Sequence, residues 1–270
     1  MRVPFVKMHG LGNDFVVLDA RTEALPPIAP AIAAALADRR TGIGCDQLIV
    51  LERSTSADFR MRIFNADGGE VEACGNASRA IALLHGRVAR VETAGGAITV
   101  EPTASGARID MGEPRFGWQE IPLAYAVDTA AMPVAWEGLN APMAVNVGNP
   151  HAVFFVADVD SVPLELLGPE IERDPLFPER VNVNVAQVTG PDSIVLRVWE
   201  RGAGLTRACG TGACATAVAA IRRGLLAGRR ATVTLPGGSL EIEWGEDGLI
   251  AMTGPAAESF RGEFEWERFA

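Results

Sequence analysis

The chain has 270 residues, 48% of them hydrophobic, and carries a formal net charge of −10 at pH 7. This length allows one large domain or two of ordinary size. We find neither a membrane-spanning apolar run of roughly 20 residues nor a signal-peptide core, so we expect a cytoplasmic protein. Because Asp and Glu outnumber Lys and Arg, and the basic residues form no cluster beyond short pairs, we expect no nucleic acid and no membrane among its partners.

The first half of the chain predicts a strand-rich unit. A short Ala-rich helix with Pro at its start is predicted over Pro30–Arg40, and a second helix begins at Cys74 and ends near Gly86. Apolar segments bounded by turn residues predict strands over Val3–His9, Phe15–Leu18, Gln47–Leu51, Phe59–Asn65, Val88–Thr93, Ile98–Pro102 and Ala107–Met111.

The second half repeats this order. A helix over Pro163–Arg173 should be interrupted at Gly168-Pro169, and an Ala-rich helix follows Cys209 and ends near Gly224–Gly228. Strands are predicted over Ala144–Val147, His151–Val156, Val181–Val188, Ile194–Trp199, Ala231–Leu235, Leu240–Trp244 and Leu249–Thr253.

Short motifs recur between the halves at a nearly constant offset. Cys74-Gly75 and Cys209-Gly210 are separated by 209 − 74 = 135 positions. Four further echoes follow in the same order, namely Gly12-Asn13 with Gly148-Asn149, Gln47 with Asn182, Arg62–Asn65 with Arg197–Glu200, and Gly95-Gly96 with Gly237-Gly238. We therefore interpret the chain as two copies of one unit.

The repeat defines the expected fold class. We predict an α/β (α+β) protein of two pseudo-symmetric domains, each a curved, mainly antiparallel sheet around a central helix. Residues 1–118 would form the half that carries Cys74, completed by a C-terminal strand at 259–270. Residues 119–258 would form the half that carries Cys209.

The cysteines and histidines do not resemble a disulfide framework or a metal site. The chain has four Cys and three His, with no C-x-x-C pair, and it shows no cofactor fingerprint. We therefore expect no metal and no cofactor. We interpret Cys45 and Cys214 as small buried side chains, since a lone Cys in an apolar segment usually packs as a small hydrophobic residue.

Cys74 and Cys209 suit a different interpretation. Each lies where a helix begins, a position that lowers a thiol's pKa and whose N–H groups can bind a carboxylate. If the repeat brings both to one substrate, one thiolate can remove an α-proton while the other thiol protonates the opposite face. Such a pair would invert the configuration of a carbon next to a carboxylate.

At this point the chain closely resembles a known family. The segments Gly12–Phe15, Phe64–Gly68, Cys74–Asn76, Gly148–His151, Val181–Val183, Glu200–Gly202 and Ala208–Ala215 are similar, in the same order, to the signatures of the diaminopimelate epimerases. The resemblance spans nearly the whole chain. It implies cofactor-independent interconversion of LL- and meso-2,6-diaminopimelate for lysine and peptidoglycan precursor synthesis, by an enzyme that is often a homodimer.

The resemblance also implies roles for individual residues. Cys74 and Cys209 would be the acid/base pair, and His151 and Glu200 would assist thiol proton transfer or hold the reacting amino group. The backbone of Gly75-Asn76 and Gly210-Thr211 would bind the reacting carboxylate. The rest of the substrate would be recognised by Asn13, Gln47, Asn65, Asn149, Asn182 and Arg201.

One departure and two alternatives accompany this resemblance. Phe260 stands where the family often has a Tyr linked to dimer contact. A proline or hydroxyproline racemase would share the two helix-start cysteines but typically has His where this chain has Asn76. A thiol redox protein would use Cys74 and Cys209 as a regulatory disulfide, although it would need an electron partner.

Overall fold

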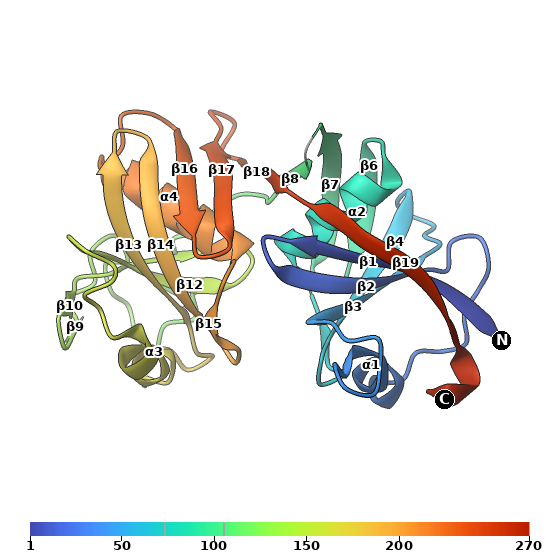
Figure 1. Cartoon of the computed structure of the whole chain (residues 1–270). Helices are drawn as coiled ribbons and strands as arrows, with labels where there is room; N and C mark the ends of the chain where they lie inside the picture. Colours follow the sequence, from blue (N-terminus) through green and yellow to red (C-terminus); the bar gives the residue numbers. More distant parts are fainter. Residues whose placement is uncertain (73, 105, 270) are drawn as a thin grey trace. The chain divides into compact units, whose positions relative to one another are not determined.

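The computed structural model describes residues 1–72, 74–104 and 106–269 (Figure 1). The chain divides into two compact units. Unit 1 comprises Met1–Ile109 and Gly254–Ala270, and unit 2 comprises Asp110–Thr253. Residues 110–118 lie in unit 2, where backbone hydrogen bonds join Met111 to Ile250 and Arg115 to Asn146. Within the described ranges, no helix is long and apolar enough to span a membrane.

Unit 1 contains two helices, α1 (Pro30–Ala37) and α2 (Gly75–His85), and a final 3-10 turn, η1 (Trp266–Arg268). Its strands are β1 (Arg2–Gly10), β2 (Asn13–Asp19), β3 (Gln47–Glu52), β4 (Phe59–Asn65), β5 (Glu70–Val71), β6 (Ala89–Thr93), β7 (Gly96–Thr103), β8 (Gly106–Asp110) and β19 (Ala257–Glu265).

Unit 2 contains the helices α3 (Leu164–Glu172) and α4 (Gly210–Arg222). Its strands are β9 (Ala135–Trp136), β10 (Leu139–Asn140), β11 (Met143–Asn146), β12 (Pro150–Phe155), β13 (Asn182–Gly190), β14 (Ser193–Glu200), β15 (Gly204–Thr206), β16 (Arg230–Leu235), β17 (Gly238–Trp244) and β18 (Ile250–Pro255).

Strand pairing repeats from one unit to the other. In unit 1, β2–β3 and β4–β6 are parallel, whereas β1–β2, β3–β4, β4–β5, β6–β7 and β7–β8 are antiparallel. In unit 2, the parallel pairs are β12–β13 and β14–β16, and the antiparallel pairs include β11–β12, β13–β14, β14–β15 and β16–β17. The predicted fold class, a repeated and mainly antiparallel sheet with a central helix, is confirmed.

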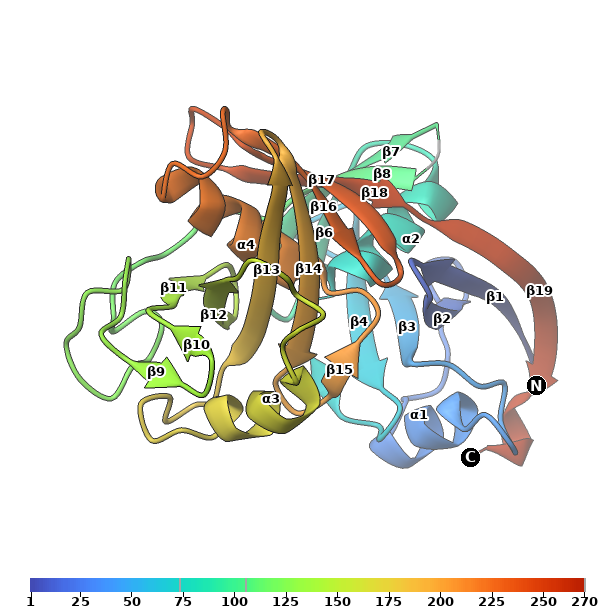
Figure 2. The same ribbon diagram turned by 60° about the vertical axis from the view of Figure 1, so that its left-hand side comes forward.

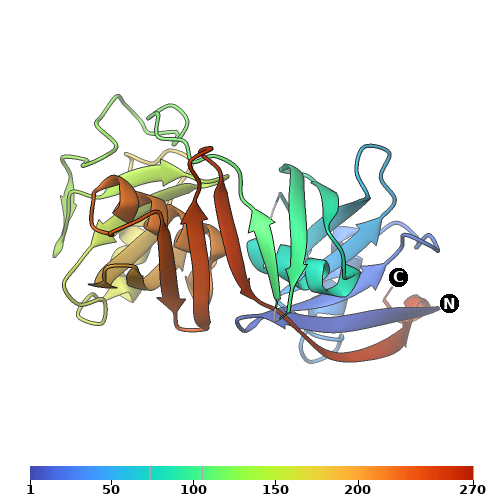
Figure 3. The same ribbon diagram turned by 90° about the horizontal axis from the view of Figure 1, so that it is seen from above.

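Each sheet curves around its second helix. In unit 1, α2 contacts β1, β7 and β19, and β19 runs antiparallel beside β1 (Figure 3). In unit 2, α4 lies against β13 and β14 (Figure 2) and also contacts β11, β12, β16 and β17. Ala-rich sequence makes this enclosure possible, because small side chains let the strands approach the helix closely. In α4, every residue from Gly212 to Ala220 is buried.

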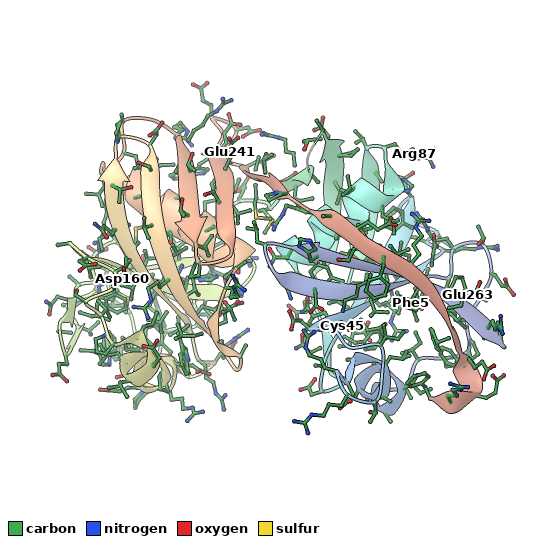
Figure 4. All side chains as sticks on the ribbon, in the orientation of Figure 1. Phe5, Cys45, Arg87, Asp160, Glu241 and Glu263 are labelled. Atoms are coloured by element: carbon green, nitrogen blue, oxygen red, sulfur yellow. The ribbon has the colours of Figure 1, made fainter. Side chains whose placement is uncertain are left out.

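The first helix of each unit covers the opposite side of its sheet. α1 packs on β3 and β4, and α3 packs on β13, β14 and β15. Cys45 is 1% exposed and belongs to the core beneath α1 (Figure 4), while Cys214 is fully buried within α4. The interpretation of both as small core side chains is therefore confirmed.

The predicted break in α3 is wrong. The helix runs from Leu164 to Glu172 with Pro169 inside it. Any other residue at position 169 would donate its backbone N–H to the Glu165 carbonyl in the first turn. Pro169 therefore removes only one hydrogen bond from this short helix. Gly168 is needed for packing, since a Cβ there would lie 2.5 Å from the Trp199 ring.

We predict that Gly168→Ala destabilises the protein by about 1–2 kcal/mol, although Ala is the better helix former by about 1 kcal/mol. The clash with Trp199 should outweigh propensity, because Trp199 Nε1 donates to Glu172 at 2.8 Å and the ring cannot withdraw without breaking this bond. Urea unfolding measures the change. Gly228→Ala is the matched control, since a Cβ there meets nothing within 4 Å. A Gly168→Ala protein as stable as the parent would contradict this packing argument.

Candidate active site

The two cysteines of the repeat occupy the same local position in their units. Cys74 is the N-cap of α2, with φ −148° and ψ 110°, and Cys209 is the N-cap of α4, with φ −130° and ψ 107°. In both cases a Gly follows and the chain turns directly from an extended residue into the helix. The predicted helix-start positions are therefore confirmed. Each thiol lies beside backbone N–H groups that have no partner within the helix.

In unit 1, Cys74 belongs to a small polar group. Its Sγ lies 3.7 Å from Oδ1 of Asn13, and the same oxygen accepts a hydrogen bond from Nδ2 of Asn76 at 3.1 Å. Asn13 in turn donates from Nδ2 to Asp46 at 3.1 Å. Asn13, Cys74 and Asn76 are thus brought together as the sequence predicted, and the Asn13 amide is oriented from both ends.

Gln47 and Asn65 form a second polar pair on adjacent strands. Gln47 Nε2 donates to Asn65 Oδ1 at 2.9 Å, and the two residues face each other across β3 and β4. Gln47 Oε1 is buried and has no hydrogen-bond partner among the described residues. Because an unsatisfied buried acceptor costs free energy, this oxygen is suited to receive a donor from a bound molecule.

In unit 2, Cys209 is 3% exposed and its sulfur has three polar neighbours, Gly212, Thr211 and Glu200. Gly212 N–H donates to its Sγ at 3.3 Å, and Thr211 Oγ1 lies 3.6 Å from the sulfur. Glu200, at the end of β14, is hydrogen-bonded to the Cys209 side chain and accepts a 2.5 Å bond from Thr206 Oγ1. The structure therefore pairs Glu200 with Cys209.

The pKa of Cys209 is not lowered as the helix-start position predicted. Burial raises it well above the ordinary value, and the neighbouring Glu200 carboxylate raises it further, while Thr211 and Gly212 lower it only in part. Burial also raises the pKa of Glu200. The prediction was wrong because removal from water outweighs the favourable helix end. The neutral thiol is thus the favoured form in this state, and neutral thiols donate protons.

His151 is hydrogen-bonded to two asparagine side chains of unit 2. It is fully buried, with Nε2 2.8 Å from Asn149 Oδ1 and Nδ1 3.1 Å from Asn184 Oδ1. Burial lowers its pKa to about 4, the Asn184 bond opposes this, and the positive charge of Arg201 adds to it. The imidazole is therefore neutral at pH 7.

Asn182 uses its amide within the protein. Its Nδ2 donates to the Pro150 carbonyl at 2.9 Å, and its Oδ1 accepts the Arg201 backbone N–H at 2.9 Å. Arg201 is exposed, and its Nη1 donates to the Glu179 carbonyl at 3.0 Å. Asn182 therefore fixes the main chain around Pro150 and Arg201.

Three residues around these groups were missed from the sequence. Asn184 is fully buried beside His151, and strand alternation with Asn182 could have identified it. Arg79 is also fully buried, donates to Asn76 Oδ1 at 2.7 Å and reaches the Pro255 carbonyl. Asp46, which orients Asn13, is bonded to Arg39 at 2.8 Å. Sequence offers no signal for the last two, because the bonds from Arg79 to Pro255 and from Asn13 to Asp46 join residues that are distant in the chain.

Comparison with known proteins gives consistent matches. The family model described as Diaminopimelate epimerase matches residues 5–117 and 143–258. The diaminopimelate epimerase of Erythrobacter litoralis (strain HTCC2594) is 71% identical over 266 residues, which cover 98% of each chain. That of Zymomonas mobilis subsp. mobilis is 56% identical over 271 residues, which cover 100% of each chain.

Solved structures share the fold at low sequence identity. A PhzF-family phenazine biosynthesis protein of Bacillus anthracis matches with a TM-score of 0.69 and 14% identity, covering 98% of this chain and 99% of its own. A hydroxyproline epimerase from Agrobacterium vitis matches with a TM-score of 0.67 and 15% identity, covering 97% and 91%. These likenesses show the fold alone.

We predict that stability depends on pH through His151. Its folded pKa of about 4 lies below the ordinary 6.5, so the unfolded chain binds the proton first and stability falls as the pH drops from 6.5 towards 4. Between pH 7 and pH 5 the free energy of unfolding should fall by about 2 kcal/mol on this account. Urea unfolding of the parent and of His151→Gln measures the difference between the two pH profiles. Parallel profiles would contradict the burial of a neutral imidazole.

We also predict that Glu200→Gln accelerates alkylation of Cys209 at pH 8. The Glu200 carboxylate raises the pKa of the Cys209 thiol, so its removal increases the thiolate fraction. Mass spectrometry after timed iodoacetamide treatment gives the rate for each cysteine. Cys45 is the internal control, because burial raises its pKa to about 11 without a contribution from Glu200. An unchanged or slower rate at Cys209 would contradict the coupling.

Proposed function

Because the chain belongs to the diaminopimelate epimerase family, we propose that it interconverts LL- and meso-2,6-diaminopimelate without a cofactor, in lysine and peptidoglycan precursor biosynthesis. The observation that carries the mechanism is the repeated N-cap thiol. Cys74 and Cys209 cap equivalent helices in two units of the same fold. Two thiols provide the two bases that inversion of an α-carbon needs.

In this proposal one thiol removes the α-proton while the other delivers a proton to the opposite face. The developing negative charge on the carboxylate is stabilised by the helix N-termini, where the backbone N–H groups of Gly75, Asn76, Gly210 and Thr211 would bind it. Helix dipoles favour negative charge at this end. The proposed reaction uses no electron sink other than these backbone N–H groups and the helix N-termini.

Cys209 and Glu200 supply the protonation chemistry of one side. The protonated thiol that burial favours is the form that donates to a carbanion. In the reverse direction, Glu200 can take the proton from Cys209 Sγ through their hydrogen bond, which leaves a thiolate that abstracts the α-proton. We therefore propose Glu200 as the residue that assists proton transfer at Cys209.

The remaining polar groups would recognise the substrate. We propose that Asn13, Gln47, Asn65 and Asn149 bind its polar ends, and that the exposed Arg201 pairs with the distal carboxylate. Asn182 would act through the Arg201 main chain, since its own amide is already bonded. The unsatisfied Gln47 Oε1 supports a role as acceptor from a substrate ammonium group.

Two alternatives make different predictions. A proline or hydroxyproline racemase-type activity would be compatible with the fold, as the hydroxyproline epimerase from Agrobacterium vitis illustrates. Asn76 at the place of the typical His, together with Arg201, favours a substrate with a second charged end. A thiol redox function would leave the polar groups around each cysteine without a purpose.

We further propose that the enzyme works in the cytoplasm as a homodimer. A reducing compartment would keep both thiols active. Phe260 on β19 is 52% exposed and packs edge-on to Phe5 at 6.0 Å between ring centroids. This apolar surface supports a subunit contact even though the hydroxyl of the usual Tyr is missing. Sedimentation equilibrium would test it.

We predict that Cys74→Ser and Cys209→Ser each lower epimerisation by about 10³-fold, because serine is far too weak an acid to replace either thiol. Chiral chromatography of LL-2,6-diaminopimelate incubations measures the meso product. Circular dichroism and thermal unfolding of both variants serve as the folding control. Retained activity in either folded variant would refute the two-base assignment. Conversion of proline or 4-hydroxyproline alone by the parent protein would refute the proposed substrate.

A further inference from the structure

Three polar side chains form a hydrogen-bonded chain inside unit 2, with Asn184 in the middle. His151, Asn184 and Thr216 are each fully buried, on β12, β13 and α4. Asn184 Oδ1 lies 3.1 Å from His151 Nδ1, and Asn184 Nδ2 lies 2.9 Å from Thr216 Oγ1. The same Nδ2 lies 2.9 Å from the Gly212 carbonyl. One amide thus connects a histidine on the sheet to the first turns of the helix that Cys209 caps.

Unit 1 shows that the fold does not need this group. By strand register and helix position, His151, Asn184 and Thr216 correspond to an apolar set in the other copy of the repeat. That set is Phe15, Ile49 and Ile81, all fully buried. Because buried polar groups are tolerated when they are hydrogen-bonded, the polar set in unit 2 fixes the orientation of its side chains in a way that the apolar set of unit 1 does not.

The bonds of Asn184 determine which way its amide points. Gly212 offers a carbonyl oxygen, which can only accept, so the NH₂ group of Asn184 must face it. The carbonyl oxygen of Asn184 therefore faces His151 Nδ1, and that nitrogen must carry the proton.

We propose that Asn184 is a positioning residue that holds His151 in the Nδ1–H tautomer, so that the Nε2 lone pair orients the amide of Asn149. The structure places Asn149 Oδ1 2.8 Å from Nε2. Because an Nε2 without a proton can only accept, the pair requires the other orientation of the Asn149 amide, in which Nδ2 donates. Asn149 then presents its NH₂ group to His151, by a half-turn of the amide, and directs its carbonyl oxygen away. The substrate-binding role of Asn149 rests on the proposed function, whereas the tautomer does not.

Charge and burial around the ring support the neutral form. The imidazole is fully buried, its pKa is lowered to about 4, and the charged group that acts on it is Arg201, which disfavours a second positive charge. A neutral imidazole with an unprotonated Nε2 is thus suited to orient the neighbouring Asn149 amide.

Nitrogen NMR of the ¹⁵N-histidine-labelled protein at pH 7.5 tests the tautomer without substrate. Long-range couplings distinguish Nε2, which couples to both ring C–H protons, from Nδ1. The His151 signals are those that survive in both His9→Gln and His85→Gln. We expect Nε2 of His151 at the chemical shift of an unprotonated nitrogen. A protonated Nε2, in either the other tautomer or an imidazolium, would overturn the proposal.

Asn184→Ile tests the positioning role by installing the residue of unit 1. We expect a folded protein in which the preference for Nδ1–H is lost, with Asn184→Ala used where the Ile variant does not fold. Thr216→Val is the matched control, because it keeps the Asn184 bonds to His151 and Gly212 and should keep the tautomer. An unchanged Nδ1–H signature in the folded Asn184 variant would refute the role of Asn184.

A double-mutant cycle, measured by KM, tests whether Asn184 acts through Asn149. We expect Asn184→Ile to raise KM about tenfold, and Asn184→Ile combined with Asn149→Ala to be no worse than Asn149→Ala alone. Independent, additive effects would contradict action through Asn149. Should the parent protein fail to epimerise diaminopimelate while its Nε2 is unprotonated, the proposed function would fail and the tautomer assignment would stand.

Discussion

The structure depends on a helix enclosed by its own sheet and capped by a cysteine. Because α4 consists largely of small residues and α2 has Ala77, Ser78, Ala80 and Ala82 among its buried positions, strands can close around each helix. The helix N-terminus then becomes one of the few places where backbone donors remain available. A side chain placed as the N-cap is therefore held beside those donors. The repeat of this arrangement places one thiol at a helix N-terminus in each unit.

The two copies share their framework but differ in their chemistry. Cys74 has amide neighbours in Asn13 and Asn76, whereas Cys209 has a carboxylate neighbour in Glu200. Burial makes the second environment costly for any charge, so its thiol is favoured in the protonated form. Divergence between equivalent positions in the repeat thus gives the two thiols different polar neighbours. His151, Asn184 and Thr216 are buried at positions that hold apolar residues in unit 1, so the difference between the two copies extends into the core.

Much of the fold could be predicted from the sequence, because the repeated apolar patterns and the two Cys-Gly motifs are local features. Short strands such as β15 could not, since three residues carry no pattern and β15 exists only through its pairing with β14. The break expected at Gly168-Pro169 was wrong because Pro169 lies close to the helix start, where it removes only the hydrogen bond to Glu165.

The sequence predicted several of the residues that come together in the candidate site, but it did not predict the direction of the pKa shift at Cys209. Cys74, Asn13 and Asn76 come together as expected. The sign of the pKa shift at Cys209 was missed, because a helix end is visible in sequence and the burial that overrides it is not. Arg79 is bonded to Pro255, 176 positions along the chain, which no local motif reveals.

The proposed mechanism requires two thiols that act on opposite faces of one α-carbon. Proton NMR of LL-2,6-diaminopimelate in D₂O, with reduced protein and a thiol reductant, distinguishes it from a one-base mechanism. A thiol that exchanges with solvent delivers deuterium to the product, while a proton taken by the other thiol returns only to the substrate. The two-base mechanism therefore predicts meso product deuterated at the inverted carbon and remaining LL substrate without deuterium at early times. Deuterium in the LL substrate before meso product forms, or protium at the inverted carbon of the product, would contradict it.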